Sequence, residues 1–255
     1  MTVKQFYERI CMKLPTDLSA PWDHDGLMVC PDEAAPVSRV LCTLDITEEA
    51  VDYAIANGFD LIISHHPLLF HPLAALTPSD HVARKALRLY EAGVSVICLH
   101  TRADAVRDGV NDRLAELLGL TDVTAVAEDE EGIARIGVLD TPMTLSDFAV
   151  QVKEVLGVPF LLTADAERTV SCVAVCGGDG KDLVDAVIAA GADTYVSGRI
   201  GYHQMVDAPE RGINMIEAGH YYTETHITAF FAELTEALLP HAVCEEFASD
   251  MILFL

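Results

Sequence analysis

Short apolar runs alternate with segments of helical periodicity along most of the chain. In the N-terminal half, strands are predicted at residues 39–45, 59–64 and 94–99, and helices at 47–57, 81–92 and 110–118. In the C-terminal half, strands are predicted at 134–139, 170–175, 194–197 and 213–217, and helices at 181–190 and after the capping box formed by Thr144 and Asp147. This alternation is typical of α/β proteins, so we expect two α/β domains with mostly parallel sheets.

An acidic run, Glu128 to Glu131, interrupts the pattern and predicts a solvated loop at a domain boundary. We therefore expect a first domain of residues 1–125 with 218–255, and a second α/β domain, 126–217, inserted into it.

The charge balance restricts the partners of this protein. The 255 residues include 40 acids against 16 lysines and arginines, a formal charge of −24. Such a surface repels phosphate backbones, so nucleic acid is a disfavoured partner.

No apolar run approaches the roughly 20 residues of a membrane span. Seven cysteines without a pairing pattern, and a first segment without the apolar core of a signal peptide, predict a cytoplasmic protein.

Polar residues that can bind metal follow three of the predicted strands. His65 and His66 end the apolar run at 59–64 and are followed at once by Pro67. The carboxyl ends of buried strands are where α/β proteins bind ligands, and paired imidazoles there suggest metal. Asp45 ends the strand before, and His100 and Asp104 follow the strand after.

A second cluster, His220 and Glu224, follows the strand at 213–217 and Gly219. If a helix begins near Tyr221, the two side chains share one helical face about a turn apart. An imidazole and a carboxylate at this spacing can grip one cation or two neighbouring cations, although an exposed polar pair is the more common reason for such spacing.

The motifs together resemble the Nif-three-like family of dinuclear metal-centre proteins, whose members often carry the name of a second type of GTP cyclohydrolase. The resemblance covers nearly the whole chain. Its six motifs occur here in the family's order: Trp22-Asp23-His24-Asp25-Gly26-Leu27, Leu44-Asp45-Ile46-Thr47, Ile63-Ser64-His65-His66-Pro67-Leu68, His100-Thr101-Arg102-Ala103-Asp104-Ala105 with Gly109-Val110-Asn111-Asp112, Cys176-Gly177-Gly178, and Gly219-His220-Tyr221-Tyr222-Thr223-Glu224.

The resemblance implies a ligand set and an assembly. It implies that His65, His66, Asp104, His220 and Glu224 hold two divalent ions, with Asp104 or Glu224 as the bridging carboxylate. The mixed nitrogen and oxygen donors suit zinc, iron, manganese or cobalt without selecting among them. The family also forms ring-like hexamers, so a homohexamer is expected.

Three other positions near these ligands have alternative roles. His100 is a candidate catalytic residue, as an additional ligand or proton carrier, or else a residue that holds Asp104 or a ligating ring by a hydrogen bond. For Asp45, capping of the helix that begins near Thr47 is favoured over contact with metal or substrate. The Trp22 to Leu27 segment is expected to form a turn beside the site.

The chain departs from the family pattern at positions outside the ligand set. Family members usually have Asn and Val where this chain has His24 and Asp25, and Asp and Lys where it has Arg199 and Gly201. Arg199 inverts a local charge, which affects the expected substrate pocket. Nearby, His203 is expected to be buried and hydrogen-bonded rather than a ligand.

Two functions follow from the expected site. The first is a metal-dependent hydrolase of a small, nucleotide-like substrate, with GTP ring opening as the reaction that the family's name implies. The second is a metal-binding hexameric assembly with a regulatory, storage or metal-delivery role and no turnover. The glycine-rich run Gly177 to Lys181 does not match the Walker pattern for phosphate binding, and a tight turn is the favoured interpretation.

Overall fold

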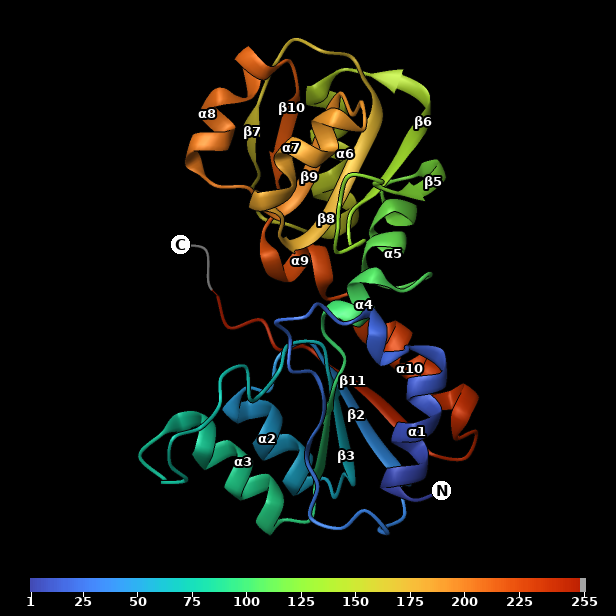
Figure 1. Cartoon of the computed structure of the whole chain (residues 1–255), viewed down its shortest axis with the longest axis vertical. Helices are drawn as coiled ribbons and strands as arrows, with labels where there is room; N and C mark the ends of the chain where they lie inside the picture. Colours follow the sequence, from blue (N-terminus) through green and yellow to red (C-terminus); the bar gives the residue numbers. More distant parts are fainter. Residues whose placement is uncertain (253–255) are drawn as a thin grey trace. The chain divides into compact units, whose positions relative to one another are not determined.

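A computed structural model describes residues 1–252 and divides the chain into two compact units (Figure 1). The first unit consists of Met1–Ala103 and Ile227–Met251, and the second is built from Asp104–His226. The second unit is therefore inserted into the first, as the sequence predicted. No helix among the residues described is long and apolar enough to cross a membrane.

The first unit is built on a five-stranded sheet of order β1-β4-β3-β2-β11. Its strands are β1 (Gly26–Val29), β2 (Arg39–Thr43), β3 (Leu61–Ser64), β4 (Ser95–Cys98) and β11 (Val243–Phe247). All neighbours are parallel except β1, which runs antiparallel to β4. The C-terminal strand β11 pairs with β2 in register Cys244 to Val40, so the returning chain completes the sheet that the N-terminal segment began.

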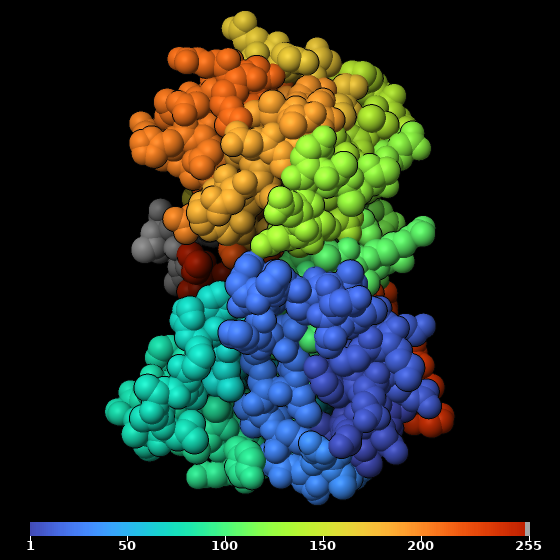
Figure 2. Space-filling view, in the orientation of Figure 1, coloured from blue at the N-terminus to red at the C-terminus, as the bar shows by residue number. Residues whose placement is uncertain are grey.

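Helices cover both faces of this sheet (Figure 1). Helices α2 (Glu48–Ala56) and α3 (His81–Glu91) lie on one face, and α1 (Val3–Lys13) and α10 (Ile227–Leu238) lie on the other. Alternate strand residues point to opposite faces, and Leu41, Ile62 and Val96 pack in the core with α2 and α3. The N-terminal segment, blue in Figure 2, forms much of the visible surface of this unit.

The second unit contains a six-stranded sheet of order β5-β6-β8-β9-β10-β7. Its strands are β5 (Leu120–Ala125), β6 (Arg135–Met143), β7 (Leu162–Ala164), β8 (Val170–Asp179), β9 (Thr194–Arg199) and β10 (Asn214–Glu217). The central strands β8, β9 and β10 are parallel to one another, and the outer strands pair antiparallel. The sheets are thus mixed, with parallel strands at the centre of each.

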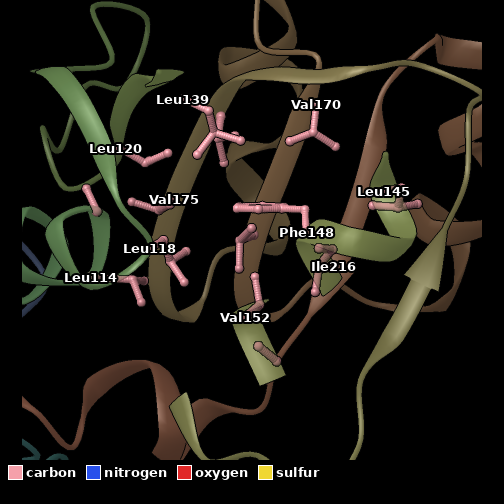
Figure 3. Packing of buried hydrophobic residues seen from close by; sticks show 14 residues of the cluster. Leu114, Leu118, Leu120, Leu139, Leu145, Phe148, Val152, Val170, Val175 and Ile216 are labelled. Atoms are coloured by element: carbon pink, nitrogen blue, oxygen red, sulfur yellow. The ribbon is translucent and has the colours of Figure 1, made fainter. Parts of the chain in front are cut away.

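Two helices pack on each face of this second sheet. Phe148 of α6 (Leu145–Leu156) lies at the centre of a core that includes Leu114 and Leu118 from α5 (Val110–Leu117) and its C-terminal end, together with Val175 and Ile216 of the sheet (Figure 3). On the opposite face, α7 (Val184–Ala189) and α8 (Tyr202–Arg211) pack over a second core. The short helix α4 (Thr101–Ala105) follows β4 and contains Asp104, and the short helix α9 (His220–Glu224) follows β10 and contains His220 and Glu224.

The compact units differ in extent from the domains expected from the sequence. Helix α5 and strand β5 were placed with the first domain, but β5 pairs with β6 and α5 packs in the core of the second unit. The acidic run lies in the turn between β5 and β6. Within it, Asp129 is buried and accepts hydrogen bonds from the backbone N–H groups of Glu131 and Ala134, so the run is only partly a solvated loop.

Candidate metal centre

Three histidines meet at the carboxyl ends of two strands of the first unit. His65 and His66 directly follow β3, and His100 lies two residues after β4. The backbone N–H groups of His65 and His66 still donate to the carbonyls of Thr43 and Leu44, which fixes this corner against the end of β2. The potential ligand atoms of the three rings lie within 4.8 Å of one another, close enough to hold one metal ion.

Each of these rings is oriented through its Nδ1 atom. His65 Nδ1 lies 3.0 Å from the carbonyl oxygen of Leu99. His66 Nδ1 lies 2.7 Å from Oδ1 of Asp45, and His100 Nδ1 lies 3.1 Å from Oδ2 of Asp23. Metal-binding histidines characteristically donate one ring N–H to a carbonyl or carboxylate, which fixes the tautomer and presents the other nitrogen to the ion. The first unit therefore has imidazole nitrogens that could bind a metal ion, and carbonyl and carboxylate groups that orient these rings.

The role expected for Asp45 was wrong. Thr47 caps α2, because its side chain accepts from the backbone N–H of Ala50. Asp45 holds the ring of His66, and its own backbone N–H donates to Oγ of Ser249 at 3.1 Å. The C-terminal segment of the first unit thus helps to position a candidate ligand.

Asp23 makes the Trp22 to Leu27 segment more than the neighbouring turn that we expected. Its carboxylate accepts from the backbone N–H and hydroxyl of Thr101, at 3.1 and 2.6 Å, as well as from His100. Burial alone would raise the pKa of Asp23, but the hydrogen bonds from His100 and Thr101 outweigh burial and hold this pKa well below its usual value. Asp23 is therefore a negative charge fixed beside His100.

Asp25, one of the departures from the family pattern, forms a buried ion pair. Both its oxygens accept from Arg102, at 2.6 Å from Nε and 2.7 Å from Nη2. Burial would lower the pKa of Arg102, whereas the hydrogen bonds that it donates to Asp25 raise this pKa above its ordinary value. Asp25 Oδ2 also accepts from the backbone N–H of His100 at 3.2 Å, so the pair supports the backbone that carries this ring.

In the second unit, His220 and Glu224 form the pair that their spacing predicted. They begin and end α9, and Nε2 of His220 lies 3.0 Å from Oε2 of Glu224. The side chain of Glu224 is buried, whereas that of His220 is about half exposed.

The neighbouring glycines make room for this carboxylate. A Cβ atom on Gly178 would lie 2.2 Å from Oε1 of Glu224, and one on Gly177 would lie 3.0 Å from Cγ of Glu224. Gly178 also has φ of +63°, which favours glycine. Gly177 to Asp179 belong to the end of β8 and Lys181 begins a short 3-10 helix, so the tight turn expected over Gly177 to Lys181 was wrong for most of its length. The end of the strand leaves room for a carboxylate.

Asn111 joins the Asp104 segment to the end of β8. Its Nδ2 donates to the carbonyl of Asp104 at 3.3 Å, and its Oδ1 accepts from the N–H of Gly177 at 2.6 Å. Asn111 belongs to a motif noted in the sequence, but the partner of its side chain lies 66 residues away and no local pattern indicates it.

Of the other departures, His24 is exposed in the first unit, and Arg199 and Gly201 lie in the second unit. Arg199, at the end of β9, is exposed. Gly201 has φ of +96°, and its N–H and that of Ile200 donate to Glu217. The expectation that His203 is buried was wrong, because it lies on the exposed surface of α8.

These features define a class of protein: two α/β units, one inserted into the other, with a histidine cluster that could hold metal at the strand ends of the first. A model of the Duf34/NIF3 (NGG1p interacting factor 3) family matches residues 1–251. The chain belongs to this family, which confirms the resemblance seen in the sequence.

Relatives with sequence and structural similarity agree with this assignment. A protein of Lactococcus lactis named "GTP cyclohydrolase 1 type 2 homolog" is 38% identical over 87% of this chain and 85% of its own length. "Protein NIF3 homolog" of Schizosaccharomyces pombe is 33% identical over 81% of this chain and 79% of its own. A Staphylococcus aureus hypothetical protein of known structure shares the fold with a TM-score of 0.89 at 24% identity, covering 100% of this chain and 99% of the other.

Proposed function

We propose that the protein is a two-metal hydrolase of a small, nucleotide-like substrate. His65, His66, Asp104, His220 and Glu224 would hold two divalent ions of zinc, iron, manganese or cobalt, with Asp104 or Glu224 as the bridging carboxylate. The observation that carries the proposal is the histidine cluster, in which all three rings are oriented through Nδ1 by a carbonyl or a carboxylate.

The order of residues along the chain supports a shared centre. Asp104 lies four residues after His100, at the point where the chain passes from the first unit to the second. Glu224 lies three residues before Ile227, where the chain returns to the first unit. Four residues of extended chain span at most roughly 14 Å. The proposed ligands of the second unit thus come from its two covalent links to the first.

Divalent ions in such a centre polarise substrate oxygens and lower the pKa of water. The protein's own contribution is to keep the ligands in place: Asp45 holds His66, and the glycines at the end of β8 leave room for the carboxylate of Glu224. We assign His100 the role of proton carrier. The negative charge of Asp23 beside its Nδ1 would stabilise a positive charge on the ring during proton transfer.

The substrate class follows from charge and from the names of relatives. The chain carries a formal charge of −24, which opposes anions unless cations offset it locally. Two bound cations would allow an acidic protein to accept a phosphorylated small molecule. Several relatives carry the name "GTP cyclohydrolase 1 type 2 homolog", so GTP is the first substrate to test.

The experiment begins with metal analysis of protein purified without chelator, followed by a screen for GTP consumption and formate release. We expect two ions per chain, and a turnover that Glu224→Gln abolishes while the fold remains. Glu128→Gln, at an exposed acid of the second unit, is the matched control and should leave the rate unchanged. Retention of two ions after His65 and His66 are both replaced by alanine would contradict the ligand set.

The histidine cluster also supports a second function, because three rings of one unit could hold an ion without any residue of the other unit. This alternative is a homohexameric, cytoplasmic metal carrier or store with no turnover. A carrier should exchange its metal rapidly with a chelator, and no substrate in the screen should be consumed. Light scattering tests the hexamer independently of either function.

A further inference from the structure

Two aromatic side chains that the metal centre does not use lie beside His100. The ring centroid of Trp22 lies 6.1 Å from that of His100 at an interplanar angle of 76°, and the centroid of Phe70 lies 6.2 Å from it at 85°. Trp22 and Phe70 are 6.3 Å apart at 65°. All three residues belong to the first unit. We call Trp22 and Phe70 together the aromatic pair.

The aromatic pair is exposed although it is apolar. Trp22 is 50% exposed and Phe70 is 46% exposed. A large aromatic side chain contributes most to stability when it is buried, so a purely structural role would favour more complete burial. Apolar surface beside a cluster of potential metal ligands is characteristic of ligand sites, which combine aromatic walls with a few polar groups.

The aromatic pair is held by the same segments that hold the histidines. Trp22 precedes Asp23, whose carboxylate accepts from His100 and Thr101. It lies two residues after Ala20, whose N–H donates to Oγ1 of Thr101 at 2.9 Å. Phe70 lies four residues after His66, beyond the buried Leu68. Short stretches of chain therefore connect both rings to residues of the histidine cluster or to their supports.

We propose that the aromatic pair binds a planar heteroaromatic ring of the substrate, such as a nucleobase, beside His100. The rings contact one another and His100 at steep angles and not as a parallel stack. Bases bind aromatic side chains by stacking on their faces, and such stacking tolerates different bases. The proposal rests on the proposed function only where it calls the ligand a substrate. Binding of the ring itself can be measured without turnover.

The protein offers a direct probe, because Trp22 is its only tryptophan. Zinc-loaded, full-length protein is titrated with adenosine, guanosine and uridine, with ribose as the control that lacks a ring. Indole emission is excited at the red edge of its absorption to avoid interference from the nucleosides. We expect saturable quenching by the nucleosides and none by ribose.

Variants test whether the aromatic pair is the binding surface. Phe70→Ala should weaken nucleoside binding by about 5- to 150-fold, the range measured when a stacking side chain is replaced by alanine. Phe160→Ala removes an equally exposed phenylalanine, 51% exposed, from the second unit and should leave binding unchanged. Trp22→Ala, followed by calorimetry, should weaken binding as Phe70→Ala does. Urea midpoints of all variants verify that they fold.

Three results would overturn the proposal: no saturable quenching by any nucleoside, equal affinity of Phe70→Ala and the parent, or a Trp22 emission that changes with protein concentration in step with oligomer mass. The last would show that a second copy covers the aromatic pair. Nucleoside binding without GTP turnover would remove the proposed reaction and leave the ring site standing. GTP turnover that is insensitive to Phe70→Ala would support the proposed reaction and contradict the ring site.

Discussion

Replacing Asp25 with alanine should be among the most destabilising single changes in the first unit. Asp25 and Arg102 have side chains that are 3% and 1% exposed, respectively. The change leaves a buried guanidinium with the carbonyl of Leu14, 3.3 Å from Nη1, but without its carboxylate. It also removes the acceptor of the Ser19 hydroxyl and of the His100 backbone N–H.

The expected magnitude follows from this burial. Removing one partner of a buried ion pair costs about 3–5 kcal/mol, because the remaining charge is left uncompensated away from water. The exposed pair between Lys4 and Glu33, whose side chains are 59% and 61% exposed, is the matched control. Lys4→Met should cost less than about 1 kcal/mol. The difference between the two variants measures the effect of burial on an ion pair.

The assay is urea unfolding monitored by the emission of Trp22, which lies in the first unit and is the only tryptophan. We expect Asp25→Ala to lower the urea midpoint with little change in slope, since a stability change without a change in exposed surface has this signature. The double variant Asp25→Val with Arg102→Met should recover most of the loss. Apolar residues of similar volume often replace a buried pair at little cost.

The double variant also decides whether the reasoning is correct. If Asp25→Ala costs no more than Lys4→Met, the pair is not buried in solution as the structure has it. If the double variant is as unstable as Asp25→Ala, the loss comes from the hydrogen bonds of Asp25 to Ser19 and His100, and the uncompensated charge of Arg102 is not its cause.

Three further changes test the two units separately. Gly178→Ala should destabilise the protein by about 1–3 kcal/mol, because alanine is strained at a φ of +63°. It should also lower the amount of metal bound per chain, since the added Cβ collides with Glu224. A variant with its full metal content would contradict this prediction. Asp45→Asn should weaken metal binding by about 10- to 100-fold in competition with a chelator, through its contact with His66; unchanged affinity would show that the contact is not a support. Phe148→Ala, at a fully buried position, should cost about 3–5 kcal/mol by urea unfolding followed by circular dichroism, and a loss under 1 kcal/mol would refute the packing seen in Figure 3.

The sequence predicted what depends on local pattern and missed what depends on distant partners. Alternating apolar runs indicated the parallel central strands, and the spacing of His220 and Glu224 predicted their contact. The support of His100 by Asp23 joins residues 77 positions apart, and no periodicity indicates such a pair. Asp45 was assigned to a helix cap because local rules favour a cap there, but tertiary contact with His66 determines its role.

The same distinction applies to the acidic run. A row of acids is typical of a solvated loop, and composition alone does not show that Asp129 is the one that turns inward. Its carboxylate satisfies the N–H groups of Glu131 and Ala134 and closes the turn between β5 and β6. A buried acceptor with two backbone donors stabilises a tight turn. The run therefore connects two paired strands of one sheet where the sequence suggested a domain boundary.

The two departures at Asp25 and Arg199 have different consequences, although each changes the charge at its position. Asp25 is compensated inside the first unit by Arg102, so this departure alters the packing beneath His100 and leaves the surface charge at that point unchanged. Arg199 is exposed and forms no ion pair with any residue that the structure describes. The nearby charge of Lys181 has the same sign. Substrate preferences that distinguish this protein from its relatives should therefore respond to Arg199→Asp, measured as a change in KM for anionic substrates. Asp25→Val with Arg102→Met should leave those preferences as they are.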